Sequence, residues 1–457
     1  MPATITTWNP EDTALWEQSE RKVAYRNLLI SIPALFLAFA VWMVWSVTVV
    51  NLPSIGFTFS TSQLFWLTAI PGLSGATLRI FYSFMVPVFG GRNWTALSTA
   101  SLLLPMIGIA WFVQEPSTPY GVFALLALLA GLGGGNFASS MSNINFFFPK
   151  AKKGLALGLN AGVGNLGVSA VQFIVPLVIG SALFGSFGGA SMTAKTPAGT
   201  REIWLQNAAL VWIPAIAIVA VAAWIGMNNL ATARASFREQ SIIFKRRHTW
   251  IMSVLYVGTF GSFIGFSAAF PLLIKTIFPA VDALSYAFLG PLVGATVRPL
   301  GGWLSDHLGG ARVTYWTFAL LILGVGGVMW SLMAGASPDF ILFFISFLTL
   351  FLATGVGNGS TFRMIPVIFR TERMREKERL GGESSALKSA ERESAAVLGF
   401  SSAIGAYGAF LIPLLFNASV SWNGSAIPAM IGLGVSYVIC IIMTWWYYSR
   451  RGAEVPC

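Results

Sequence analysis

Gly75-Ala-Thr-Leu-Arg79 and Gly294-Ala-Thr-Val-Arg298 are two nearly identical phrases, each inside a long apolar stretch of this 457-residue chain. A proline, Pro71 or Pro291, precedes each phrase, and an arginine ends it. If these stretches cross a membrane, each guanidinium costs roughly 2.5–3.5 kcal/mol to bury, so such residues usually face a protein interior or a water-filled path. The repetition predicts a duplicated chain in which two positive charges converge on one central anion.

The composition around these phrases is that of a membrane protein with many spans. The chain is 55% hydrophobic and 10% charged, whereas soluble proteins carry roughly 25% charged residues. Its mean hydropathy is +0.72. We therefore expect an all-α membrane protein with twelve transmembrane helices, because a span needs roughly 20 apolar residues and twelve runs are long enough: residues 28–51, 64–87, 94–113, 120–148, 154–183, 206–227, 250–274, 283–304, 313–334, 340–369, 394–416 and 425–448.

The net charge of +11 follows the loops and does not indicate a nucleic-acid partner. If the N-terminus is cytoplasmic, the inner segments hold most of the lysines and arginines, and the outer loops hold only Lys195, Arg201 and Lys275. This positive-inside pattern predicts that both termini are cytoplasmic. Residues 1–27 are polar and acidic and do not look like a signal peptide.

The spans divide into two halves of six. We expect a cytoplasmic tail, a first half, a cytoplasmic linker, a second half and a final tail, at residues 1–27, 28–227, 228–249, 250–448 and 449–457. The second half contains a charged cytoplasmic segment, 370–392, expected to be a solvated loop or a short amphipathic helix. Duplicated halves are typical of secondary transporters, whose substrate site lies near the midplane of the membrane.

A second internal echo consists of glycines at matching spacings. Small residues allow transmembrane helices to approach closely, so these positions are expected to be packing sites. They are Gly158, Gly164 and Gly167 in the fifth span and Gly399, Gly405 and Gly408 in the eleventh.

Groups that could perform chemistry are absent from the predicted span interiors. The 17 acidic residues fall in tails, loops or span ends, and His248 and His307 fall in predicted cytoplasmic loops. Neither an embedded enzyme nor a proton relay of side chains is therefore expected. Two isolated cysteines, Cys440 and Cys457, give no disulfide framework and no metal spacing. We expect no catalytic residue, no metal and no cofactor.

Arg79 and Arg298 consequently have no acidic partner within the predicted spans. Backbone carbonyls could neutralise each one, or the side chain could reach the cytoplasmic end of its helix. Their equivalent depth in both halves favours paired ligands for an oxyanion, because the guanidinium fork is planar and always charged. Arg363 lies nearer the inner end of its span, where snorkelling or a gate role is expected.

Several longer motifs resemble a known family. Gly302–Arg312 resembles the cytoplasmic loop motif of the major facilitator superfamily, and Gly158–Ser169 and Gly399–Phe410 look like the two signature motifs of its nitrate/nitrite porters. Gly133–Gly154 and Gly357–Met364 strengthen the match. The resemblance covers all twelve spans and implies a major facilitator fold with two pseudo-symmetric six-helix halves in a bacterial inner membrane.

In that family two arginines bind the anion between aromatic rings. The resemblance implies that these ligands are Arg79 and Arg298. It also implies flanking rings at Phe137 and Phe362 and hydrogen bonds from Asn165 and Tyr256.

The implied function is nitrate/nitrite antiport by alternating access. The expected partners are nitrate, nitrite and membrane lipids, without nucleic acid, and the protein is expected to be monomeric. Three alternatives stay open. They are proton-coupled nitrate symport, organic phosphate exchange, which the signature motifs disfavour, and a non-transporting anion sensor that signals through 370–392.

Overall fold

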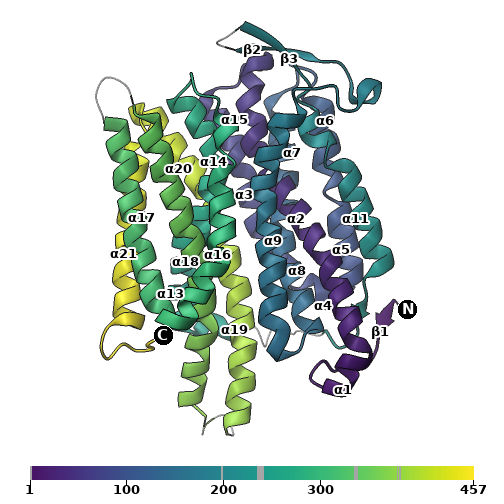
Figure 1. The fold of residues 1–457 in the computed structure, drawn as a ribbon, viewed down its shortest axis with the longest axis vertical. Helices are drawn as coiled ribbons and strands as arrows, with labels where there is room; N and C mark the ends of the chain where they lie inside the picture. Colours follow the sequence, from purple (N-terminus) through teal and green to yellow (C-terminus); the bar gives the residue numbers. More distant parts are fainter. Residues whose placement is uncertain (1–2, 197–198, 234–240, 334–337, 378, 380–381) are drawn as a thin grey trace. The chain divides into compact units, whose positions relative to one another are not determined.

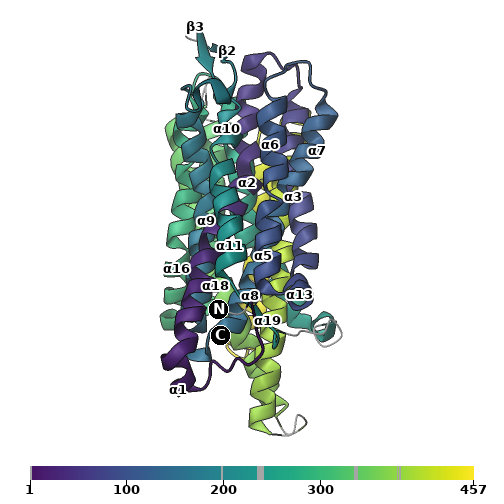
Figure 2. The same cartoon turned by 90° about the vertical axis from the view of Figure 1, so that its right-hand side faces the viewer.

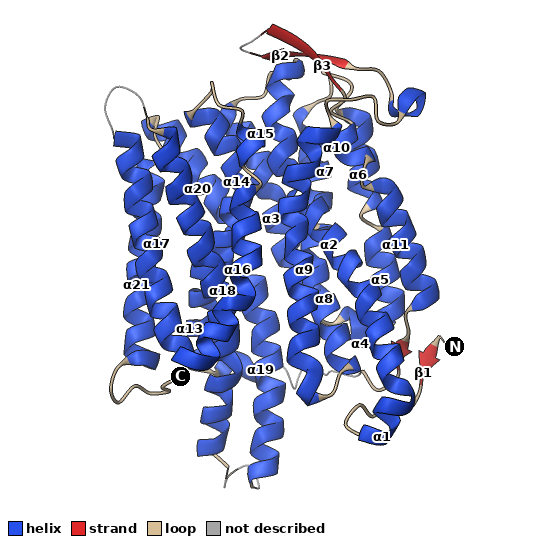
Figure 3. Cartoon of the chain, viewed as in Figure 1, coloured by secondary structure: helices blue, strands red, loops and turns tan. Residues whose placement is uncertain are grey.

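The structure is a computed structural model that describes residues 3–196, 199–233, 241–333, 338–377, 379 and 382–457. Residues 234–240 of the predicted linker and residues 378, 380 and 381 of the predicted charged segment lie outside the described residues. Within the described ranges helices dominate, and the strands form two short pairs (Figure 3).

The chain divides into two compact units, and each is described by itself. The first comprises Met1–Arg234 with Ser267–Leu292, and the second comprises Ala235–Phe266 with Val293–Cys457. The boundary passes through two continuous helices, α14 (Ser262–Ile277) and α16 (Leu289–Leu308). The segment 267–292, which belongs to the predicted second half, is therefore grouped with the first unit.

The first unit is organised around a long helix, α2 (Arg21–Asn51). It packs against α8 (Leu132–Phe147) and α9 (Lys150–Val178), while α3 (Thr61–Tyr82) packs against α8 and α7 (Tyr120–Ala130). Figure 2 shows this unit from the side on which α5, α9 and α11 are labelled. The remaining helices are α1 (Thr13–Leu15), α4 (Met85–Phe89), α5 (Gly91–Ala100), α6 (Leu103–Phe112), α10 (Asn207–Leu210), α11 (Ile213–Gly226) and α15 (Ala283–Tyr286).

Both strand pairs belong to the first unit. Strand β1 (Thr4–Ile5) pairs in parallel with β4 (Asn229–Leu230). Strand β2 (Met192–Thr196) pairs antiparallel with β3 (Gly199–Ile203). The first pair ties the segment before α2 to the segment after α11.

In the second unit α17 (Gly310–Met333) packs against both α18 (Phe340–Arg375) and α21 (Ile427–Thr444), and α18 packs against α19 (Glu383–Ala406). Among the described residues this unit also contains α13 (Arg247–Tyr256), α20 (Gly408–Asn423) and most of α16. π-helical turns follow α13 at Val257–Gly261 and α21 at Trp445–Ser449.

Local sequence explains where the key helices begin. Ser60 and Gln63 form a reciprocal capping box at the start of α3, which satisfies backbone donors that would otherwise have no partner. The Asp339 side chain accepts a hydrogen bond from Leu342 N at the start of α18. Each cap stands at the start of a long apolar helix, close to where the apolar runs 64–87 and 340–369 predict a span to begin.

Among the described residues, eleven helices are long and apolar enough to cross a membrane. The predicted run at 283–304 corresponds to α15 and α16, and α16 is not among the eleven. Its sequence includes Arg298, Asp306 and His307, which lower the mean hydropathy of this helix.

The charged segment 370–392 is largely helical. Helix α18 continues to Arg375 and α19 begins at Glu383. These two helix ends project side by side from the lower end of this unit in Figure 1. The charge pattern left a loop and a short helix as alternatives, but the described residues instead extend the two neighbouring transmembrane helices.

Candidate functional site: a buried arginine beside aromatic rings in each unit

Arg79 lies near the end of α3 and is 1% exposed. Its Nε donates a hydrogen bond to the Gly134 carbonyl oxygen on α8 at 3.0 Å. The guanidinium carbon lies 4.8 Å from the centroid of the Phe137 ring and 5.2 Å from that of Trp42. A guanidinium at these distances is attracted to the ring faces, so backbone and aromatic contacts together fix its position.

Glycines at the helix crossing bring Arg79 to this place. A Cβ added at Gly134 would lie 2.7 Å from Gly75 Cα, and one added at Gly75 would lie 2.5 Å from Trp42 Nε1. Both distances are shorter than side chains tolerate, so α3, α8 and the Trp42 ring meet only because these positions lack side chains. The glycine of the repeated phrase therefore has a structural purpose.

Trp42, which the sequence interpretation missed, holds one wall of this site. It is fully buried on α2, and its Nε1 donates a hydrogen bond to the Pro71 carbonyl oxygen at 2.7 Å. Phe39 contacts both Trp42 and Phe137 with ring centroids 5.7 and 6.1 Å apart. A buried indole N–H usually has a hydrogen-bond partner, so a tryptophan inside an apolar span was the signal available in the sequence.

Two asparagines on α9 differ in their partners. Asn160 Nδ2 donates to the Ser140 hydroxyl oxygen at 2.8 Å, and Ser140 in turn lies 2.8 Å from the Ser31 hydroxyl. Asn165 is 0% exposed, and neither atom of its amide group has a hydrogen-bond partner among the described residues. Buried amides are rarely left without partners, so Asn160 ties helices together whereas Asn165 has free capacity for a ligand.

In the second unit Arg298 occupies the corresponding place on α16. It is 7% exposed, and its guanidinium carbon lies 5.5 Å from the centroid of the Phe362 ring on α18. Its Nη1 is buried without a hydrogen-bond partner in the part of the chain that the structure describes. The repeated phrase thus places a buried arginine beside an aromatic ring in both units.

The second crossing is also made by glycines. A Cβ at Gly355 would lie 2.2 Å from the Gly294 carbonyl oxygen, and one at Gly359 would lie 2.1 Å from the Arg298 carbonyl oxygen. The backbones of α16 and α18 are therefore in direct contact. Gly294 matches Gly75 in the repeated phrase, and it makes the equivalent close approach.

Tyr256 ends α13 and is 1% exposed. Its ring stacks on Phe260 with centroids 5.4 Å apart and an interplanar angle of 25°. A Cβ at Gly405 would lie 2.8 Å from the Tyr256 ring. The same Cβ would lie 3.2 Å from the Phe260 ring, so both rings lie against Gly405 on α19.

Comparison with known proteins identifies the family. The Major Facilitator Superfamily matches residues 34–374. The chain is 49% identical over 448 residues to the "Nitrate/nitrite transporter NarU" of Escherichia coli (strain K12), which covers 98% of this chain and 96% of that protein. It is 44% identical over 458 residues to the "Probable nitrate/nitrite antiporter NarK2" of Thermus thermophilus, which covers 99% of this chain and 98% of that protein.

The chain belongs to the nitrate/nitrite porters of the Major Facilitator Superfamily. The resemblance seen in the motifs is thereby confirmed, and so is the expected fold class. A crystal structure of a bacterial homologue of the human lysosomal transporter Spinster has the same fold, with a TM-score of 0.60. It is 16% identical and covers 93% of this chain and 96% of that chain, so it supports the fold alone.

The signature glycines fall into two groups. A Cβ at Gly167 would lie 2.1 Å from the Phe36 carbonyl oxygen, and one at Gly408 would lie 2.1 Å from the Gly261 carbonyl oxygen. A Cβ at Gly164 would lie 2.7 Å from Leu35 Cγ. These three, with Gly405, stand where helices touch. By contrast, a Cβ at either of the other two positions would meet nothing within 4 Å; these positions are Gly158 and Gly399.

Some titratable side chains have positions or partners that the sequence did not predict. His248, expected in a loop, is the second residue of α13 and is 1% exposed. Arg363 is half-exposed and its Nε lies 2.5 Å from Asp306 Oδ1, so a carboxylate partner explains this arginine. Among the described residues, no group of three or more histidine, cysteine or acidic side chains could hold a metal ion.

Proposed function

We propose that this chain transports nitrate and nitrite, as an antiporter that works by alternating access. One observation carries the proposal. In each unit a buried arginine, Arg79 or Arg298, lies on a helix whose glycine contacts a neighbouring backbone, and each of these two arginines lies beside an aromatic ring. The printed names of the relatives point to the same substrates and, for the Thermus protein, to antiport.

In the proposed binding site the two guanidinium groups are the anion ligands. Phe137 and Phe362 flank the anion, and Asn165 and Tyr256 donate hydrogen bonds to it. Arginine suits nitrate and nitrite because its parallel N–H donors match a planar oxyanion. Among the described residues neither the amide of Asn165 nor Nη1 of Arg298 has a hydrogen-bond partner, which supports these assignments.

Exchange follows from the charge balance. Two arginines carry a charge of about +2, and one bound monovalent anion leaves about +1. An empty carrier would bring both uncompensated cations through an occluded, poorly hydrated state, which is costly because buried charges lose hydration without gaining a counter-ion. The loaded carrier should therefore reorient much faster than the empty one. No acidic or histidine relay is needed for this coupling.

Counter-flow in proteoliposomes tests the proposal. Vesicles loaded with nitrite should accumulate labelled external nitrate at least tenfold faster than empty vesicles. A reorientation barrier that is higher by about 1.4 kcal/mol in the empty carrier already gives a factor of ten. Equal uptake into empty and loaded vesicles would exclude obligatory exchange.

The same assay separates the rival functions. An internal pH indicator would report acidification in step with nitrate entry if the protein were a proton symporter. A sensor would bind nitrate without any flux. Preferential uptake of organic phosphates would identify the phosphate exchanger instead.

The proposal also covers location and organisation. We place the chain in the bacterial inner membrane as a monomer surrounded by lipid, with both termini in the cytoplasm, because the lysines and arginines concentrate in alternate segments. The halves are proposed at 28–227 and 250–448, joined by the linker 228–249. Cysteine accessibility at either end of the chain, in intact cells and in inverted vesicles, tests the orientation.

A further inference from the structure

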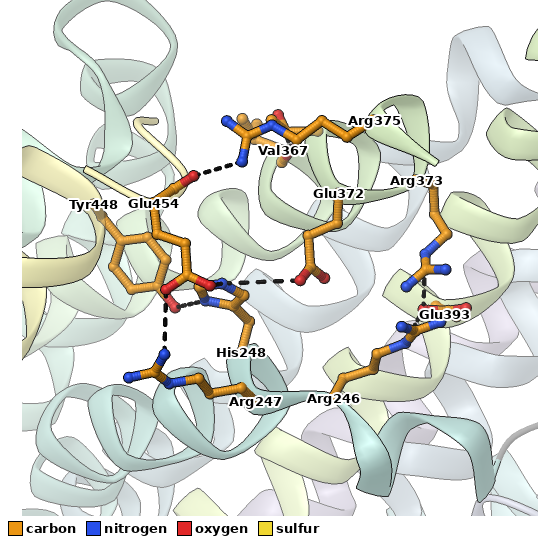
Figure 4. Close-up of polar contacts among 11 residues, drawn as sticks. Arg246, Arg247, His248, Val367, Glu372, Arg373, Arg375, Glu393, Tyr448 and Glu454 are labelled. Atoms are coloured by element: carbon orange, nitrogen blue, oxygen red, sulfur yellow. Dashed lines mark hydrogen bonds and ion pairs between the residues drawn. The ribbon is translucent and has the colours of Figure 1, made fainter. Parts of the chain in front are cut away.

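A second cluster of charged side chains lies in the second unit, around the start of α13 (Figure 4). The Nδ1 atom of His248 lies 2.8 Å from the Tyr448 hydroxyl oxygen. The other ring nitrogen, Nε2, lies 3.5 Å from Glu454 Oε1 and 3.8 Å from Glu372 Oε1. One buried imidazole therefore faces two carboxylates, which come from α18 and from the segment after α21.

The other charged and titratable groups around His248 come from each element packed against it. Arg246 and Arg373 both pair with Glu393, with N–O distances of 3.3 and 3.4 Å. Glu393 thus forms ion pairs with two arginines, whereas the carboxylates of Glu372 and Glu454 are the ones that lie next to the imidazole. The full set consists of Arg246 and Arg247 at the start of α13, Arg373, Arg375 and Glu376 on or next to α18, Glu393 on α19, Tyr447 and Tyr448 on the π-helical turn, and Cys457.

Glu454 belongs to a segment, residues 453–457, that is built into this unit. Val455 is 1% exposed and its N–H donates to the Tyr447 carbonyl oxygen at 3.2 Å. The Cys457 carbonyl oxygen accepts a hydrogen bond from Ala311 N at 2.9 Å. Arg375 Nη1 donates to the Glu454 carbonyl oxygen at 2.7 Å. The segment therefore connects α17, α18 and the π-helical turn.

We propose that His248, Glu372 and Glu454 form a proton-binding site whose occupancy controls how tightly residues 453–457 dock. When the imidazole carries a proton, its positive charge lies within 4 Å of both carboxylates and holds the segment in place. When the imidazole is neutral, two negative charges face each other across it. The segment is then held by the ion pair of Glu454 with Arg247, by the hydrogen bond from Arg375 to the Glu454 carbonyl oxygen and by the backbone hydrogen bonds of Val455 and Cys457. Histidine is the side chain whose ordinary pKa lies between pH 5 and 8.

The site is connected to the proposed anion site through two helices. Helix α13 carries His248 near its start and Tyr256 at its end, and α18 carries both Phe362 and Glu372. Docking of the segment should therefore restrain the helices that present the aromatic side of the anion site. This consequence for transport rests on the proposed function, whereas the proton-dependent docking does not.

Cys457 provides a direct test, because it lies within the segment and burial raises its pKa to about 12. In a Cys440→Ser background, the rate of maleimide labelling is measured from pH 5.5 to pH 8 and divided by the rate for the same chain in SDS at each pH. This ratio removes the intrinsic effect of pH on thiol reactivity. We expect the ratio to rise at least threefold toward pH 8.

The matched control is His307, the other histidine of the chain. It is exposed on α16, where its Nδ1 lies 2.8 Å from the Trp303 carbonyl oxygen. His307→Gln should retain the rise, and His248→Gln should give a high ratio at every pH. Glu454→Gln, at a half-exposed position, keeps the shape of the side chain and should reduce the rise. A ratio that is independent of pH in the parent chain, or an unchanged rise in His248→Gln, would overturn the proposal.

Nitrate counter-flow measured over the same pH range tests the coupling to transport. We expect the exchange rate of the parent chain to change at least threefold through a step that His248→Gln abolishes and His307→Gln retains. Exchange that is identical in the three proteins would overturn the coupling while the labelling result decides the proton site. Absence of nitrate exchange from all of them would instead contradict the proposed function.

Discussion

The two copies of the repeated phrase place their arginines in different surroundings. Arg79 is 1% exposed, donates Nε to the Gly134 carbonyl oxygen and lies beside two rings. Arg298 is 7% exposed and lies beside one ring, and among the described residues it has no hydrogen bond to a backbone carbonyl like that of Arg79. Duplication thus preserved the charge and the glycine crossing but not the hydrogen bonding. The difference suggests that the protein itself holds Arg79 more firmly, and that Arg298 depends more on the bound anion.

The largest expected effect comes from replacing each arginine by lysine. A hydrogen bond to a charged group contributes roughly 1.5–3 kcal/mol, so Arg298→Lys should weaken nitrate binding about 10- to 100-fold. Arg79→Lys should weaken it less, about tenfold, because its Nε is already committed to Gly134. The measurement is the nitrate concentration that gives half-maximal counter-flow, with surface expression as a control. Unchanged affinity in both variants would contradict bidentate recognition.

The glycine crossings should show equal costs in the two units. Gly134→Ala and Gly355→Ala each place a Cβ against backbone, 2.7 Å from Gly75 Cα and 2.2 Å from the Gly294 carbonyl oxygen. Overpacking of this kind costs about 1–3 kcal/mol, so both variants should lower the thermal midpoint of the purified protein.

The matched controls for the crossings are Gly158→Ala and Gly399→Ala, where a Cβ meets nothing within 4 Å. Both should leave the midpoint unchanged. A drop as large as that of Gly134→Ala would mean that these two glycines are packing positions after all.

The aromatic walls give a smaller contrast. A cation–π contact contributes about 0.5–2 kcal/mol, so Phe362→Leu should raise the half-saturating nitrate concentration a few-fold. Trp42→Phe keeps a ring but loses the hydrogen bond to Pro71, and about 1 kcal/mol for that bond predicts roughly a fivefold effect or less. Trp42→Leu should exceed Trp42→Phe. If the two were indistinguishable, the ring of Trp42 would have no part in holding Arg79.

The smallest effect is expected outside the crossings, at Arg363. Its ion pair with Asp306 joins two half-exposed side chains, and exposed pairs contribute about 0.2–1 kcal/mol. Arg363→Gln should therefore change the thermal midpoint by no more than a few degrees and leave nitrate affinity within twofold. A loss of affinity comparable to that of Arg298→Lys would place Arg363 in the anion path.

Much of the fold could be predicted because apolar run length is a local property. Runs of about 20 residues locate the spans, and the position of α18 from Phe340 agrees with the run predicted at 340–369. The prediction ended that span at Phe369, before the charged segment 370–392, whereas the helix continues to Arg375. Charged residues are good helix formers, so composition marks where the apolar part stops rather than where the helix stops.

The sequence by itself identified the family through its signature motifs and predicted the spans from its apolar runs. It also predicted the two arginines of the proposed site, because an arginine in an apolar run is conspicuous in any sequence. The tertiary structure alone decided which side chains surround them. Trp42 meets Arg79, and His248 meets Glu454, across long separations in the chain. Such contacts depend on how helices cross, and a linear pattern of hydrophobicity does not contain that information.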